Sequence, residues 1–93
     1  MPVEINKLVF VKVENYVSTF EFENGQHINC VEPLKYIEKN LGDDFVRINR
    51  NYLVNINKIE LIDIKKRQLT IKSKNYKISC RKMKILLKSY KKI

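Results

Sequence analysis

The 93-residue sequence is poor in several residue types: it has two glycines, two prolines, two cysteines, one histidine and no tryptophan. With glycine only at positions 25 and 42, the chain cannot form a glycine-rich phosphate-binding loop. The spacing between Cys30 and Cys80 fits neither a disulfide framework nor a set of zinc ligands. We therefore expect a reduced protein in the cytoplasm, and a structural disulfide is the less favoured alternative.

Catalytic groups and membrane-spanning runs are also scarce. The single histidine, His27, falls in a segment predicted as a strand, and Asp43 and Asp44 follow an expected helix end, where solvated loop charges are more common than acid–base pairs. No stretch approaches the roughly 18 consecutive apolar residues of a membrane span, and no secretory signal is visible. We expect no enzymatic activity, no metal, no cofactor and no membrane partner.

Positive charge is abundant and unevenly placed. The 19 Lys and Arg residues against 10 Asp and Glu give a net charge of +9. Residues 1–46 carry four basic and eight acidic side chains, a net charge of −4, whereas residues 47–93 carry fifteen and two, a net charge of +13. A hydrophobic content of 44% is enough for a folded core, and the length suits a single domain spanning residues 1–93.

Hydrophobic periodicity predicts a mostly β fold with two helices. The first strand is apolar on both faces, and Tyr16, Ser18, Phe20 and Phe22 then alternate on one face, with Tyr16 expected in the core. Asn24-Gly25 is expected to form a hairpin turn in which both residues have positive φ. The predicted strands cover residues 8–13, 16–23, 26–31, 45–48, 52–54, 59–64, 68–72 and 76–78.

Two helices are expected between and after these strands. Pro33 opens the first, and Gly42 suits the left-handed position just past its end. Ser79 is the expected N-cap of the second. Its apolar stripe is Met83, Leu86, Leu87 and Tyr90, and its opposite face carries Lys82, Lys84, Lys88, Lys91 and Lys92.

The segment from Arg47 to Tyr52 places two arginines and two asparagines around a strand-to-strand connection. Arginine offers a fixed donor fork that matches guanine or a phosphate, and asparagine matches adenine. If one strand ran through the segment, Arg47, Asn49 and Asn51 would share a face. An ordinary polar turn is the alternative, since asparagine favours turns in any case.

Three further segments are candidates for binding an anion. Arg81 and Lys82 lie in the first turn of the last helix, where free backbone N–H groups favour a phosphate or a base edge; the alternative is an arginine stem that covers apolar neighbours. Lys65-Lys66-Arg67 forms a cationic hairpin tip, or only a solubilising one. Asn15, after the first strand, is a weaker candidate. These groups act together only if the fold gathers them on one surface.

At these residues the sequence resembles the LytTR-type DNA-binding domain, the output module of LytR/AlgR-family response regulators, over roughly residues 7–90. Asn15-Tyr16-Val17 resembles the family's first-loop signature, and Ser79-x-Arg81 resembles the one before the last helix. The family signature Phe-x-Arg-x-His-Arg-Ser-Tyr-Leu-Val-Asn is matched by Phe45-Val46-Arg47-Ile48-Asn49-Arg50-Asn51-Tyr52-Leu53-Val54-Asn55, followed by Ile59 and Ile62. Two positions depart from this signature, Asn49 in place of His and Asn51 in place of Ser, and both keep a hydrogen-bonding side chain.

The resemblance implies an elongated, antiparallel β-sandwich-like fold of short sheets, with a short middle helix and a C-terminal helix. Such domains read double-stranded DNA with loop side chains that enter successive major grooves, and the duplex bends. Carried over by position, Arg50 and Arg81 are the base readers, with Asn15 or a near neighbour in the first loop. The auxiliary or DNA-backbone contacts are Asn49, Asn51, Lys65, Lys66, Arg67 and Lys82.

The resemblance also implies transcriptional regulation, paired direct repeats as the DNA target, a homodimer on DNA, and a receiver domain or signalling partner. The chain is either an excised output domain or a free-standing regulator. The alternative function is a small basic β domain that binds RNA or an acidic protein. Because the phenylalanines alternate into the core, Tyr52 and Tyr76 are the expected exposed rings, which disfavours base stacking on RNA.

Overall fold

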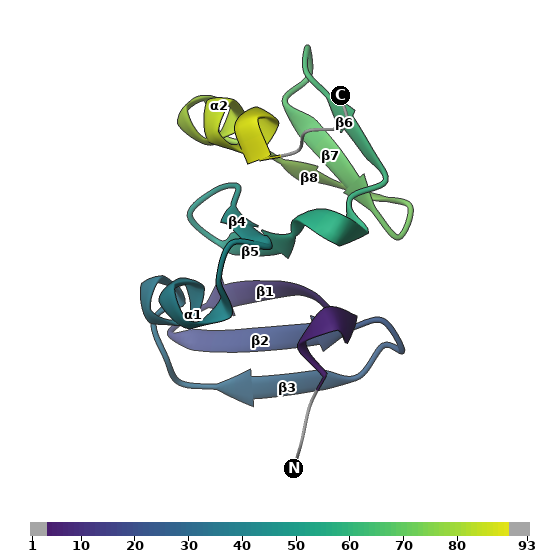
Figure 1. Cartoon of the computed structure of the whole chain (residues 1–93). Coiled ribbons are helices and arrows are strands. Elements are labelled where there is room, and N and C mark those ends of the chain that lie inside the picture. Colours follow the sequence, from purple (N-terminus) through teal and green to yellow (C-terminus); the bar gives the residue numbers. More distant parts are fainter. Residues whose placement is uncertain (1–3, 90–93) are drawn as a thin grey trace.

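The structure, a computed structural model, describes residues 4–89, which form two antiparallel sheets and two α-helices (Figure 1). The molecule is elongated, with principal extents of 39 × 24 × 22 Å. The large sheet has the strand order β3-β2-β1-β5-β4 and the small sheet the order β6-β7-β8. The mostly β, sandwich-like fold predicted from the sequence is therefore confirmed.

The elements follow the chain in a simple order. The large sheet consists of β1 (Leu8–Glu14), β2 (Val17–Phe22), β3 (His27–Cys30), β4 (Phe45–Arg47) and β5 (Tyr52–Asn55). The small sheet consists of β6 (Leu61–Asp63), β7 (Gln68–Ile71) and β8 (Lys74–Lys77). The helices are α1 (Leu34–Leu41) and α2 (Cys80–Ser89), and two 3₁₀ turns are η1 (Ile5–Lys7) and η2 (Ile56–Lys58).

Strand alternation builds a hydrophobic core on each face of the large sheet. Successive side chains of a strand point to opposite faces. Val11, Leu53 and Phe45 lie in a core with residues of α1. Their neighbours Phe10, Val54 and Val46 lie in the other core, with residues of the small sheet and α2. β1 is thus buried on both sides, as its continuous apolar run predicts.

The last helix begins where the sequence predicts. The Ser79 hydroxyl accepts a hydrogen bond from the backbone N–H of Lys82 at 3.2 Å, so Ser79 is the N-cap. Met83 and Leu86 of α2 are buried in the core of the small sheet. The predicted Tyr90 of the apolar stripe, and Lys91 and Lys92 of the basic face, lie outside the described residues.

Two predicted details of the turns are wrong. Tyr16 does not enter the core: it forms the β1–β2 turn with Asn15, both at positive φ (70° and 47°), and it is 89% exposed. β2 starts only at Val17, so the turn directs the Tyr16 side chain outward. In Asn24-Gly25 only Gly25 has positive φ, because the Asn24 side chain instead accepts the N–H of Gln26 at 2.9 Å.

The first helix also starts later than predicted. Pro33 is its cap residue in an extended conformation, and its carbonyl accepts the N–H groups of Tyr36 and Ile37. Gly42 ends the helix at φ 88° and ψ −166°, a region that is essentially restricted to glycine. The predicted strand over residues 59–64 shortens to β6, because η2 and an extended link precede it.

A cluster of three aromatic rings joins the two sheets. Tyr52 lies 5.4 Å from Phe10 and 5.1 Å from Tyr76 between ring centroids, and Phe10 and Tyr76 are 5.6 Å apart. The prediction that Tyr52 and Tyr76 are exposed is therefore wrong, since each ring is half-buried against the other sheet. Burial between the sheets raises the pKa of the Tyr76 hydroxyl above its ordinary value.

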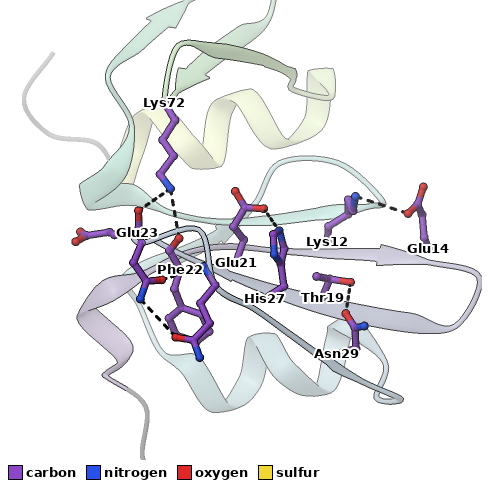
Figure 2. Close-up of polar contacts among 11 residues, drawn as sticks. Lys12, Glu14, Thr19, Glu21, Phe22, Glu23, His27, Asn29 and Lys72 are labelled. Carbon is purple, nitrogen blue, oxygen red and sulfur yellow. Dashed lines mark hydrogen bonds and ion pairs between the residues drawn. The ribbon is translucent and has the colours of Figure 1, made fainter.

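Beyond this cluster the same face of the large sheet is polar. Figure 2 shows Glu21 beside His27 and Thr19 beside Asn29, in pairs that cross from β2 to β3. Both pairs are hydrogen-bonded at 2.9 Å. His27 is an exposed strand residue, as the sequence indicates.

Polar contacts connect the two sheets at one end of the molecule. The Lys72 ammonium, in the β7–β8 turn, donates hydrogen bonds to the carbonyls of Phe22 (3.3 Å), the last residue of β2, and Glu23 (2.9 Å), in the β2–β3 turn (Figure 2). Lys58 of η2 forms an ion pair with the Glu23 carboxylate. The hydrogen bond from Lys58 lowers the pKa of Glu23 below its ordinary value, with desolvation opposing it and nearby lysines contributing.

The lowered pKa of Glu23 makes part of the stability depend on pH. A carboxyl group with a depressed pKa in the folded state stabilises the fold above its unfolded pKa, about 4.3 for Glu, and this contribution disappears as the pH falls through the folded value. We expect Glu23→Gln to lower the melting temperature at pH 7, and we expect this difference from the wild type to shrink as the pH falls below about 4. Thermal unfolding followed by circular dichroism across this range measures the difference.

Glu14→Gln is the control, because the Glu14 carboxylate is largely exposed and lies 3.6 Å from the Lys12 ammonium, so the pair is screened by solvent. An equal, pH-dependent loss in both variants would contradict a specific role for Glu23.

Candidate nucleic-acid interface

The loop between β4 and β5, residues 48–51, is folded by two side chains. The Arg47 guanidinium donates hydrogen bonds to the carbonyls of Asn49 (3.4 Å) and Arg50 (3.1 Å). The Asn49 side-chain oxygen accepts the backbone N–H groups of Asn51 (2.7 Å) and Tyr52 (3.0 Å). The strand stops at Arg47, so the arrangement with Arg47, Asn49 and Asn51 on one strand face does not form. Arg50 is left exposed at the tip of the loop.

This loop lies directly against the start of α2. The Asn49 amide nitrogen donates to the carbonyl of Lys77 at 2.7 Å, and the backbone N–H of Ser79 donates to the carbonyl of Ile48 at 2.8 Å. The result is a shared depression of about 320 Å³, which contains both predicted base-reading arginines. Its lining residues are Arg47, Asn49, Arg50, Ser79, Arg81 and Lys82.

The β1–β2 turn lies on the same side of the molecule. The N–H of Val13 donates to the carbonyl of Asn51 at 2.9 Å, and the Asn51 amide donates back to the carbonyl of Val13 at 3.4 Å. This turn carries Asn15, which is exposed at positive φ and does not line the depression. Figure 1 shows this turn, the β4–β5 loop and α2 along one side, with the β7–β8 turn on the opposite side.

The β6–β7 turn brings three further cations near the first turn of α2. Lys65, Lys66 and Arg67 are exposed. The Arg67 carbonyl accepts the N–H of Ile78 at 2.8 Å, and its guanidinium donates to the thiol sulfur of Cys80. The Asp63 carboxylate holds the turn through the N–H of Lys66 at 3.0 Å. These cations therefore adjoin the depression without lining it.

A larger depression of about 470 Å³ lies next to the first and shares Arg47 and Lys82 with it. Its lining also includes the acidic residues Glu38 and Asp43. Because only the smaller depression is lined by cations and neutral polar groups alone, it is the one suited to a polyanion.

Two contributors to this interface are absent from the set of residues predicted to contact DNA. Arg47 folds the loop, and the carbonyl of Lys77 joins the loop to β8, through residues 28 positions apart in the sequence. A contact over such a distance has no local sequence signal. The two cysteines are free thiols. Within residues 4–89, His, Cys, Asp and Glu side chains form no cluster of three that could hold a metal, and no helix is long and apolar enough to cross a membrane.

Comparison with known proteins defines the class of this protein and then its family. The chain is a DNA-binding domain: the family model described as the LytTr DNA-binding domain matches residues 1–91. The protein therefore belongs to the LytTR family, as its signature segments predict. Domains of this family serve as DNA-binding modules in transcription regulation.

A solved structure from Bacillus cereus has the same fold. It is a LytTr DNA-binding domain assigned to a methyl-accepting/DNA response regulator, and it superposes with a TM-score of 0.83 at 21% sequence identity. The match covers 98% of this chain and 87% of that chain. No curated protein matches the chain.

Proposed function

We propose that this domain binds specific sequences of double-stranded DNA, and that Arg50 and Arg81 read bases in the major groove. The observation that carries the proposal is that these two exposed arginines, from separate elements, line one depression at one end of the molecule. A guanidinium presents a planar fork of donors that matches the O6 and N7 acceptors of guanine. Two such forks side by side suit neighbouring base pairs of one duplex.

The surrounding groups suit the DNA backbone and an adjacent groove. Phosphate neutralisation supplies affinity that does not depend on sequence, whereas base contacts supply discrimination. Asn15, exposed in the β1–β2 turn beside the β4–β5 loop, is the proposed base contact in an adjacent groove. The proposed phosphate contacts are Lys65, Lys66, Arg67 and Lys82. The proposed auxiliary contacts, in the β4–β5 loop, are Asn49 and Asn51.

The domain acts, in this proposal, as the output module of a bacterial two-component regulator. It binds paired direct repeats as a homodimer assembled on DNA, and it is regulated by a receiver domain or another signalling partner. The description of the Bacillus cereus relative as part of a response regulator supports this assignment. The family's role as a DNA-binding module supports it independently.

The second candidate, binding of RNA or an acidic protein, has less support. Readers of single-stranded RNA stack bases on aromatic rings of an exposed sheet face. In residues 4–89 the most exposed rings are Tyr16, in a turn, and Tyr36, on α1, so no sheet face offers such a platform. A gel-shift competition between duplex DNA and structured RNA distinguishes the two, and preferential displacement by RNA would contradict the DNA proposal.

Removal of either proposed base reader should weaken specific binding. Each good bidentate contact is worth about 1–3 kcal/mol against a wrong base, so we expect Arg50→Ala and Arg81→Ala each to lower the affinity for a selected duplex about ten- to a hundred-fold. The affinity for random duplex DNA should change much less. Fluorescence anisotropy with both duplexes measures the ratio, and equal losses on both would remove that arginine from the set of base readers.

Removal of a proposed phosphate contact should act on every sequence alike. We expect Lys66→Ala to lower the affinity for selected and random duplexes by the same factor and to reduce the slope of log K against log salt by about one unit.

Lys74→Ala is the matched control for this experiment. It removes one exposed cation from the start of β8, at the opposite end of the small sheet. The same slope change in both variants would mean that net charge, and not position in the β6–β7 turn, determines the effect.

A further inference from the structure

We propose that Asn49 is a positioning residue, which holds the two base-reading arginines in a fixed relation and does not itself read a base. The inference rests on the proposed function of Arg50 and Arg81. It concerns the contacts that join the loop bearing Arg50 to the helix start bearing Arg81.

The Asn49 side chain is already engaged within the protein. An asparagine amide has two N–H donors and one oxygen with two lone pairs. The Asn49 oxygen accepts the N–H groups of Asn51 and Tyr52, and its nitrogen donates to the carbonyl of Lys77. Bidentate reading of adenine requires the oxygen and the nitrogen together. Asn49 would have to release the turn that presents Arg50 before it could make that contact.

The same side chain completes a link of two hydrogen bonds between the β4–β5 loop and the start of α2. One bond runs from the Asn49 amide to the carbonyl of Lys77 at 2.7 Å, and the other from the N–H of Ser79 to the carbonyl of Ile48 at 2.8 Å. Ile48 and Ile78, which flank these bonds, are 0% and 3% exposed and share one core. The link is therefore anchored in the rigid interior on both sides.

Each arginine is one or two residues from this link. Arg50 follows Asn49 directly, and its carbonyl is held by Arg47. Arg81 follows the N-cap Ser79 by two residues, within the first turn of α2. Because a binding group must be held within about 0.5 Å of its productive position, loosening the link should weaken both arginine contacts together.

The test is site selection from a random duplex pool with the wild type and with Asn49→Ser, Arg50→Ala and Arg81→Ala. Serine can still accept a backbone N–H in the turn but is too short to reach Lys77. Asn49→Asp is the second variant: it keeps an acceptor oxygen, removes the amide donor and adds a negative charge, so only its base preference, and not its overall affinity, is compared with the wild type. Asn24→Ser is the matched control, because Asn24 forms the same kind of turn with Gln26 at the opposite end.

We expect both Asn49 variants to lose base preference at the pairs that Arg50→Ala and Arg81→Ala relax, and at no further pair. The ratio of specific to random affinity should fall about ten-fold for Asn49→Ser, with the salt slope unchanged, and Asn24→Ser should match the wild type. Loss of preference at a separate base pair would show that Asn49 reads a base. Unchanged preference in both variants, or an equal loss on specific and random DNA in Asn49→Ser, would equally overturn the proposal.

A measurement without DNA separates this inference from the proposed function. In Asn49→Ser the N–H of Ser79, which bonds to Ile48, should exchange with solvent at least ten-fold faster than in the wild type, whereas Asn24→Ser should leave it unchanged. Wild-type protection in Asn49→Ser would contradict the link. If the proposed function is wrong, Arg50→Ala and Arg81→Ala lose base preference at no position of the selected sites. The exchange measurement then still decides whether Asn49 joins the β4–β5 loop to the start of α2.

Discussion

The packing of the small sheet and α2 against one face of the large sheet determines where every cationic loop of this domain lies. The buried side chains of Ile48, Leu69 and Leu86 share the core between these layers. Lys72 and Lys58 close the interface at one end, and the link from the β4–β5 loop to the start of α2 closes it at the other. With both ends held, segments far apart in the sequence present their side chains from one rigid body.

The uneven charge of the chain follows the same division. The acidic half of the sequence, residues 1–46, forms β1, β2, β3, α1 and most of β4, and the basic half, residues 47–93, forms β5, the small sheet and α2. The fold brings Arg50 and Arg81 into one depression and sets the cationic β6–β7 turn beside it, whereas the acidic residues Glu38 and Asp43 line the neighbouring depression. A polyanion is therefore attracted to this side of the molecule, as the proposed loop readout of DNA requires.

Local sequence patterns predicted most of the fold, but they predicted few of the contacts between residues that lie far apart in the sequence. The burial of β1 and the N-cap Ser79 follow from residue type and spacing alone. The exposure of Tyr16 was missed because the turn, and not the apolar pattern, determines where β2 begins. The burial of Tyr52 and Tyr76 was missed because each is covered by the opposite sheet. For the site, sequence pattern identified Arg50 and Arg81 as candidates through a family resemblance, but no spacing indicates that Asn49 meets Lys77.

In the proposed mode of binding, Arg50 and Arg81 approach one duplex together. The most direct measurement is an NMR titration that follows the side-chain Nε–H signals of both arginines while a selected duplex is added. The account predicts that both signals shift at the same DNA ratio, and that a random duplex moves them less. A shift of only one signal, or equal shifts with both duplexes, would contradict it.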